Sequence, residues 1–127
     1  MVQGGYKGQL SARGETLVLS DKKGRVVSTN LYLGNPSGPQ QNLRITEIMY
    51  HPADAPAGNT NDNGNFEYIE VQNIGATPLN LNRARLRGGI EFEFPNLVLS
   101  AGQFAVVVKD LAAFSSRYNT NGLVIAG

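Results

Sequence analysis

Three arginines spaced two residues apart could form a binding face for an anionic ligand. Arg83, Arg85 and Arg87 would share one face of an extended strand, because successive side chains of a strand point to opposite faces. Guanidinium groups bind phosphate and sulfate groups, and an aromatic side chain such as Tyr68 would let a base or a sugar stack beside them. This arrangement suggests a carbohydrate- or nucleic-acid-binding module, provided that nothing else in the chain pairs with the arginines.

The residues that follow offer such partners. Glu91 and Glu93 also share a face, and a three-residue turn over residues 88–90 would pair the two strands with every face matched. The predicted pairs are Arg87 with Glu91, Arg85 with Glu93, and Leu86 with Phe92. We therefore expect a solvated, salt-bridged sheet face, and we keep the ligand-binding function of the arginines as the alternative.

An asparagine-rich loop has the spacing of a calcium-binding loop. Counted from Asn59, oxygen-bearing side chains and a glycine fall at the first, third, fifth, sixth and twelfth places, and the twelfth is Glu70. However, Asn59, Asn61 and Asn63 are neutral, and Glu70 lies in a predicted strand rather than at the start of a helix. Asp54 and Asp62 are close enough in sequence to join such a site. We expect a plain turn-forming loop, with weak calcium binding over residues 59–70 as the open alternative.

Other chemistry has few candidate groups in this sequence. The chain has no cysteine and a single histidine, His51, which stands beside Pro52 in a predicted loop. A transition-metal site or a histidine-dependent nucleophile needs more partners than these. We therefore predict no catalytic residue, no metal site and no cofactor.

The composition indicates a turn-rich β protein without a membrane span. The 127 residues carry a net charge of +1 and include 15 glycines and 6 prolines, and no apolar run is long enough to cross a bilayer. A net charge this small gives no reason to expect a nucleic-acid partner. The length fits one domain.

Alternating apolar residues predict strands over most of the chain. Residues 15–32 resemble a hairpin that turns at "DKKG", and residues 35–42, rich in glycine, proline and glutamine, are expected to form a linker. In residues 43–49 we expect Leu43 and Ile45 to alternate with Arg44 and Ile48. The apolar run 104–108 predicts a central strand, and Asp110 is the predicted N-cap of the one short helix.

Several of these segments together resemble a known family. The stretches "LRITEIMYHP", "EYIEVQNIGATPLNL" and "GGIEFEFPNLVLSAGQFAVVVKDLAAFSSRY" resemble the opening two-thirds of a lamin tail domain of the bacterial type. The resemblance implies an all-β, immunoglobulin-like antiparallel β-sandwich. It also implies a non-catalytic structural or protein-interaction module within a larger secreted or cell-surface bacterial protein.

The order of the segments differs from that of the family. Residues 1–34 resemble its closing strands, and they precede residues 43–127, which resemble its opening strands; Val2 and Gly5 repeat the spacing of Val124 and Gly127. The order is that of a tandem repeat cut out of phase or of a permuted domain. We expect one sandwich over residues 1–127, in which the hairpin completes the sheet left open at residues 123–126. A monomer is the favoured state, a swapped dimer is the alternative, and other domains of the same polypeptide or a surface protein are the expected partners.

Overall fold

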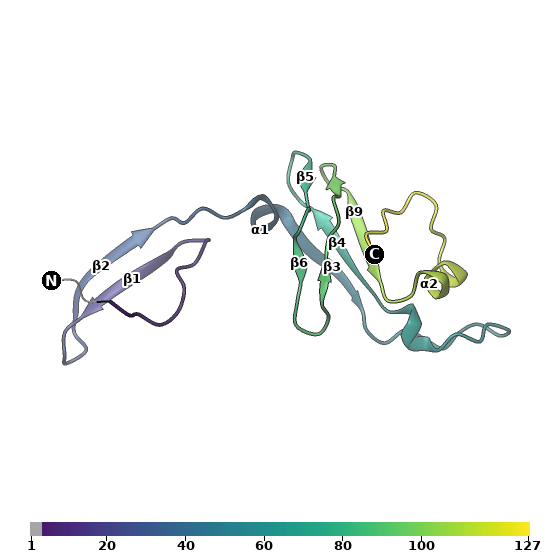
Figure 1. Ribbon diagram of the computed structural model, residues 1–127, viewed down its shortest axis with the longest axis horizontal. Helices are drawn as coiled ribbons and strands as arrows, with labels where there is room; N and C mark the ends of the chain where they lie inside the picture. The colour runs from purple at the N-terminus through teal and green to yellow at the C-terminus, as the bar shows by residue number, and fades with distance from the viewer. Residues whose placement is uncertain (1–3) are drawn as a thin grey trace. The chain divides into compact units, whose positions relative to one another are not determined.

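The computed structural model describes residues 4–127 and divides the chain into two units, of which the first ends at Ser37 and the second spans Gly38–Gly127. Val2, one half of the sequence match noted above, lies outside the described residues. Strands in antiparallel sheets dominate both units, and a few residues are helical (Figure 1). Each unit is described by itself below.

The first unit is built around the predicted hairpin. Strand β1 (Glu15–Ser20) pairs antiparallel with β2 (Val26–Tyr32) to form a two-stranded sheet. At the turn, Asp21 Oδ1 accepts hydrogen bonds from the backbone N–H groups of Lys23 and Arg25 at 2.8 and 3.0 Å, and Gly24 takes a positive φ of 79°. The hairpin and its turn residues are therefore confirmed.

A second set of contacts closes the other end of the hairpin. The Tyr32 hydroxyl donates to Glu15 Oε1 at 2.7 Å and lies 3.1 Å from the carbonyl oxygen of Ser11. A Cβ added to Gly34 would collide with the backbone of Ala12 and Gly14. The chain before β1 therefore packs closely against the chain after β2.

The second unit contains seven strands and three short helical segments. In chain order these are α1 (Gly38–Asn42), β3 (Leu43–Met49), the 3-10 helix η1 (Asn63–Phe66), β4 (Tyr68–Asn73), β5 (Leu79–Asn80), β6 (Arg85–Leu86), β7 (Phe92–Glu93), β8 (Val98–Leu99), β9 (Phe104–Val108) and α2 (Leu111–Arg117). The sheets have the orders β3-β4-β9, β5-β8 and β6-β7, and all of their strand pairs are antiparallel.

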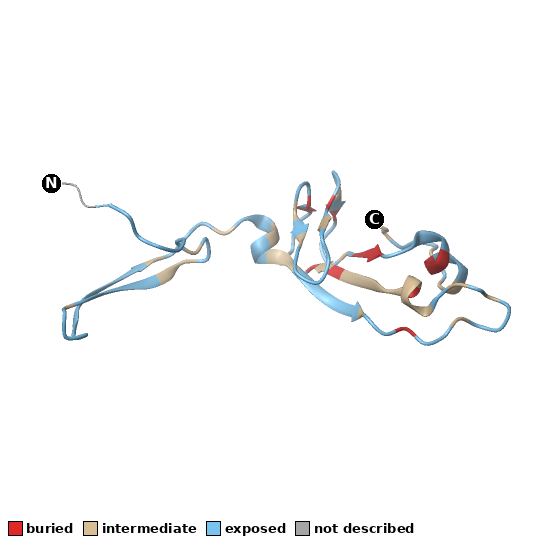
Figure 2. Cartoon of the chain, turned by 60° about the horizontal axis from the view of Figure 1, so that its bottom comes forward, coloured by how far each residue is buried: buried red, intermediate tan, exposed pale blue. Residues whose placement is uncertain are grey.

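Strand β9 is central, as its apolar run predicts. One side of it pairs with β4, and the other side bonds to the C-terminal segment through a parallel bridge between Val106 and Ile125. The backbone N–H of Val106 donates to the Val124 carbonyl at 2.9 Å, and that of Ala126 donates to the Val106 carbonyl at 2.8 Å. Residues 105–108 are all buried, so both faces of this strand contribute to cores (Figure 2).

The buried side chains form two clusters on opposite faces of the β3-β4-β9 sheet. The larger one lies against the short strands and comprises Val71, Leu79, Leu81, Phe94, Leu99, Ala105 and Val107. The smaller one joins Val106, Val108 and Phe114, the last of which comes from α2. Asp110 caps α2 as predicted, because its Oδ1 accepts from the backbone N–H of Ala113 at 2.9 Å.

A bulge in β3 overturns part of the predicted alternation. The register pairs Ile45 with Val71 and Ile48 with Ile69, so both isoleucines face the larger cluster. Ile48 was expected on the face of Arg44, and that prediction is wrong because an extra residue is inserted between Ile45 and Glu47. Helix α1 was also not predicted: it occupies most of the stretch expected to be a linker.

Candidate functional site

An open groove of about 460 Å³ lies at one end of the β3-β4-β9 sheet. It is lined by the ends of β3 and β9, the start of β4, and the loop from β6 to β7. These elements meet here because β4 pairs antiparallel with both β3 and β9, which brings their ends together around the start of β4. The groove thus belongs entirely to the second unit.

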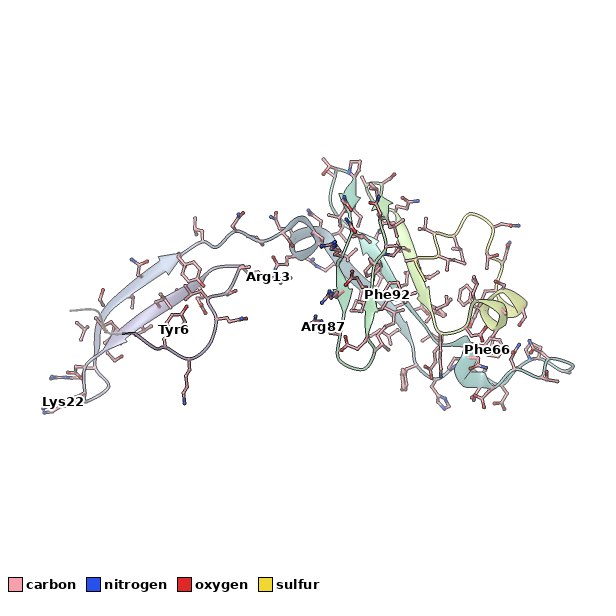
Figure 3. All side chains as sticks on the ribbon, viewed as in Figure 1. Tyr6, Arg13, Lys22, Phe66, Arg87 and Phe92 are labelled. Carbon is pink, nitrogen blue, oxygen red and sulfur yellow. The ribbon has the colours of Figure 1, made fainter. Side chains whose placement is uncertain are left out.

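The lining of the groove is mainly apolar. Five apolar side chains line it: Ile48, Ile69, Ile90, Phe92 and Val107. The ring of Phe92 packs edge-on against that of Phe94, with 5.0 Å between the ring centroids. Figure 3 shows Phe92 among the side chains of the β-rich second unit. Side chains already held in place by the core leave less conformational freedom to lose when a partner binds.

The outer strand of this sheet extends the apolar surface. Ile45 and Ile48 of β3 face the same side as the larger core, yet they are 53% and 57% exposed. Their partners on β4 face the same side, and of these Val71 is buried and Ile69 is half-buried. The short strands therefore cover the middle of the sheet and leave its β3 margin open (Figure 2).

Acidic side chains border the groove. Glu67 and Glu91 line it together with one base, Lys109, whose Nζ lies 3.5 Å from Glu67 Oε2. On the opposite face of the sheet, Glu47 accepts a hydrogen bond of 2.7 Å from the Tyr68 hydroxyl, and burial together with this bond raises the pKa of Tyr68. Tyr68 therefore stays a neutral donor, and the border of the groove carries more negative than positive charge.

Two of the three pairs predicted for the arginine strand are confirmed. Arg85 pairs with Glu93 and Leu86 pairs with Phe92. The Arg85 guanidinium contacts Glu93 Oε2 through Nη2 at 2.6 Å and Nε at 2.7 Å. Leu86 and Phe92 are half-buried and pack against the larger core cluster. The salt-bridged sheet face expected from the sequence is thus present at Arg85.

The arginine row is shorter than the spacing suggests. Arg83 has a φ of 63° in a turn before β6, so it does not continue the strand. Arg87, labelled in Figure 3, follows the last residue of β6, and the register does not include its predicted pair with Glu91. Tyr68 packs instead against Phe114 and Tyr118, with centroid distances of 5.5 and 5.8 Å. The structure therefore assigns Tyr68 to the core beside α2.

The side chains of the asparagine-rich loop bond mainly to one another. Asn59 Oδ1 accepts from the backbone and side chain of Asn61, and Asp62 Oδ1 accepts from Gly64 N at 2.8 Å as the N-cap of η1. The Asn63 side chain donates to Asp54 at 3.3 Å. Glu70 lies in β4, where it accepts from Thr46 at 2.7 Å. Within residues 4–127, no group of three or more His, Asp or Glu side chains could hold a metal ion.

His51 is exposed and lies beside buried Pro52, as expected. Its ring centroid is 6.3 Å from that of Tyr50. No helix among the described residues is both long and apolar enough to cross a membrane.

The hairpin of the first unit carries a second apolar surface. Six apolar side chains of β1 and β2 are between 46% and 65% exposed: Leu17, Val18, Leu19, Val26, Val27 and Leu31. Opposed residues share a face, so Leu17 and Leu19 lie on one face while Val18 and Leu31 lie on the other. Lys22 stands at the turn of this hairpin (Figure 3).

Two features of the second unit were not predicted from the sequence. One is the groove, which depends on residues far apart in the chain. The other is Asn73, which is fully buried and whose side-chain Nδ2 donates to the carbonyls of Thr77, Leu99 and Ser100 at 2.8, 3.1 and 3.0 Å. The signal available for Asn73 was a polar residue at the end of an apolar strand.

Comparison with known proteins gives no match: no family model, no curated protein and no solved structure matches the chain.

Proposed function

We propose that this chain is a non-catalytic protein-interaction module of the lamin tail type, with an immunoglobulin-like sandwich, in a larger secreted or cell-surface bacterial protein. The family, the bacterial source and the location come from the sequence resemblance given above. The observation that carries the interaction function is the pair of exposed apolar sheet surfaces, one on β1 and β2 and the other on β3 beside the groove.

Such surfaces favour association with protein. An outer strand presents unpaired backbone groups that another strand can bond, and exposed apolar side chains add a gain from burial of about 25 cal/mol per Å². A hairpin of two strands is marginally stable in water unless it packs against something else. Both surfaces therefore gain stability when another polypeptide covers them.

Photo-crosslinking within the full-length protein tests this function. A benzoylphenylalanine at Val18 or at Ile48 should crosslink to polypeptide, and one at Thr60, in the exposed polar loop, should not. Mass spectrometry of the products identifies the crosslinked peptides.

The opposite result would favour the ligand-binding function of the arginines. It consists of an absence of protein crosslinks from Val18 and Ile48, together with saturable binding of a labelled oligonucleotide or sulfated oligosaccharide. In that case the double variant Arg85→Ala/Arg87→Ala should lose the binding, and the salt dependence of the affinity should become less steep.

A further inference from the structure

The two exposed apolar surfaces carry opposite charge. Residues 1–37 contain five basic side chains and two acidic ones, whereas residues 38–127 contain six basic and eight acidic ones. The net charges are therefore +3 for the first unit and −2 for the second. At the surfaces themselves, Lys22 and Lys23 are exposed at the turn of the hairpin, and Glu67 and Glu91 line the groove together with a single base, Lys109. Complementary potentials steer the encounter of two surfaces and fix how they align.

The chain enters the second unit at one end of β3, and the groove lies at the other. The chain enters through α1, where Gly38 lies close to Leu79 of β5 and Asn42 directly precedes β3. The groove lies at the opposite end of β3, beside Ile48 and Met49. A strand of this length spans roughly 20 Å, since each residue advances about 3.3 Å. The chain thus enters the second unit at the end of β3 that is remote from the groove.

We propose that the hairpin β1–β2 of one copy of this chain docks on the β3 margin and groove of a second copy. The proposal rests on the proposed interaction function and names the partner. Apolar side chains of the hairpin cover Ile45 and Ile48, and Lys22 and Lys23 lie near the acidic border that includes Glu91. The contact joins two different surfaces, so it either closes into a small ring or continues as a head-to-tail chain of copies.

The absence of cysteine from the sequence makes a clean crosslinking test possible. Two full-length single-cysteine chains, Leu19→Cys and Ile48→Cys, are mixed in equal amounts and treated with a short bismaleimide. Both positions are exposed, at 62% and 57%, so the substitutions should leave the fold intact. The expected product is a dimer of the two different chains. The matched control, Thr60→Cys with Leu19→Cys, should give far less of it.

Charge reversal provides a second, independent measurement. Light scattering of the unaltered chain should show a mass that rises with concentration. Lys22→Glu/Lys23→Glu and Glu91→Lys should each weaken this association several-fold, up to roughly tenfold, because attraction across the contact becomes repulsion. Mixing the two variants should restore it, since the altered hairpin then meets the altered groove. A general loss of stability would not be repaired by mixing.

The results that would overturn the proposal are equally specific. One is a chain that stays monomeric at all concentrations while a Leu19→Cys/Ile48→Cys double variant crosslinks within one molecule. Another is crosslinking of Val18 and Ile48 in the full-length protein to a different polypeptide only, which leaves the interaction function standing but excludes the second copy. Failure of the interaction function itself appears as the absence of any protein crosslink together with saturable binding of the labelled oligonucleotide or oligosaccharide.

Discussion

Asn73 shows how much a single polar side chain contributes to the second unit. Besides its three donated bonds, its Oδ1 accepts from Gly75 N at 2.9 Å, and its backbone bonds to Gln103 and Gly102. One residue thus holds the end of β4, the turn before β5 and the turn before β9 in a fixed relation. Its place at the end of a strand is the one local signal that the sequence offers, and it does not reveal the bonds, because the acceptors are carbonyls that only the folded chain brings close.

We expect Asn73→Ala to destabilise the protein by about 2–4 kcal/mol, because it removes a fully buried amide and leaves one buried and two partly buried carbonyl groups without this donor. Urea unfolding followed by circular dichroism measures the change. The matched control is Asn80→Ala, which removes an exposed bond to Asn82 N and should cost about 1 kcal/mol or less. Equal midpoints for the two variants would contradict the role given to Asn73.

Val106 and Arg85 offer a second contrast between buried and exposed side chains. Val106 is 5% exposed, so Val106→Asp would bury an unpaired charge at a cost of several kcal/mol, against a total stability of about 5–15 kcal/mol. Arg85→Ala removes a pair with Glu93 whose side chains are 50% and 46% exposed, which contributes about 1 kcal/mol at most. Thermal unfolding should show Val106→Asp largely unfolded and Arg85→Ala close to the unaltered chain. Similar melting temperatures would mean that the core lies elsewhere.

At the scale of elements, sequence patterns predict structure best where the determinants are local. The hairpin turn has its aspartate and glycine within five residues, α2 has its cap beside it, and the β6–β7 register follows from matching charges across a short loop. The bulge in β3, in contrast, interrupts the alternation of side chains between the two faces of the sheet, and the sequence pattern of this strand does not indicate it. Helix α1 contains a glycine and a proline in five residues, and it packs against β5, a contact that no local pattern reports.

The hairpin turn should respond to acid. Hydrogen bonds from the Arg25 backbone and side chain and from the Lys23 backbone lower the pKa of Asp21. A lowered pKa in the folded state means that the stabilisation is complete above the unfolded pKa of about 3.9 and is lost as the pH falls through the lower folded value. Carboxyl NMR should give a midpoint for Asp21 below about 3.9, with the amide signal of Arg25 moving in parallel. A midpoint at or above the ordinary value would contradict this account, and Asp21→Asn should remove the coupled shift of the Arg25 signal.

At the scale of the whole molecule, the separation of charge between the two units predicts salt-dependent association. Raising the ionic strength from about 0.05 to 0.5 M shortens the screening length to a few ångströms and should shift the chain toward the monomer in light scattering. The variant Glu91→Lys should show a weaker salt response than the unaltered chain. If association instead strengthens steadily with salt, apolar burial alone drives it and the charges have no role.

The strand pairings also set a difference in folding rate between the two units. Strands β1 and β2 are joined by a turn of a few residues, and hairpins of this kind form in about 1–10 μs. Strand β4 instead pairs with β9, from which β5 to β8 separate it in the sequence. The C-terminal segment must then bond in parallel to the other side of β9. Contacts so distant in sequence slow folding by orders of magnitude. During refolding, or as the chain leaves the ribosome, the hairpin therefore forms before the surface proposed to bind it. A second copy whose second unit has already folded is then the first to present that surface.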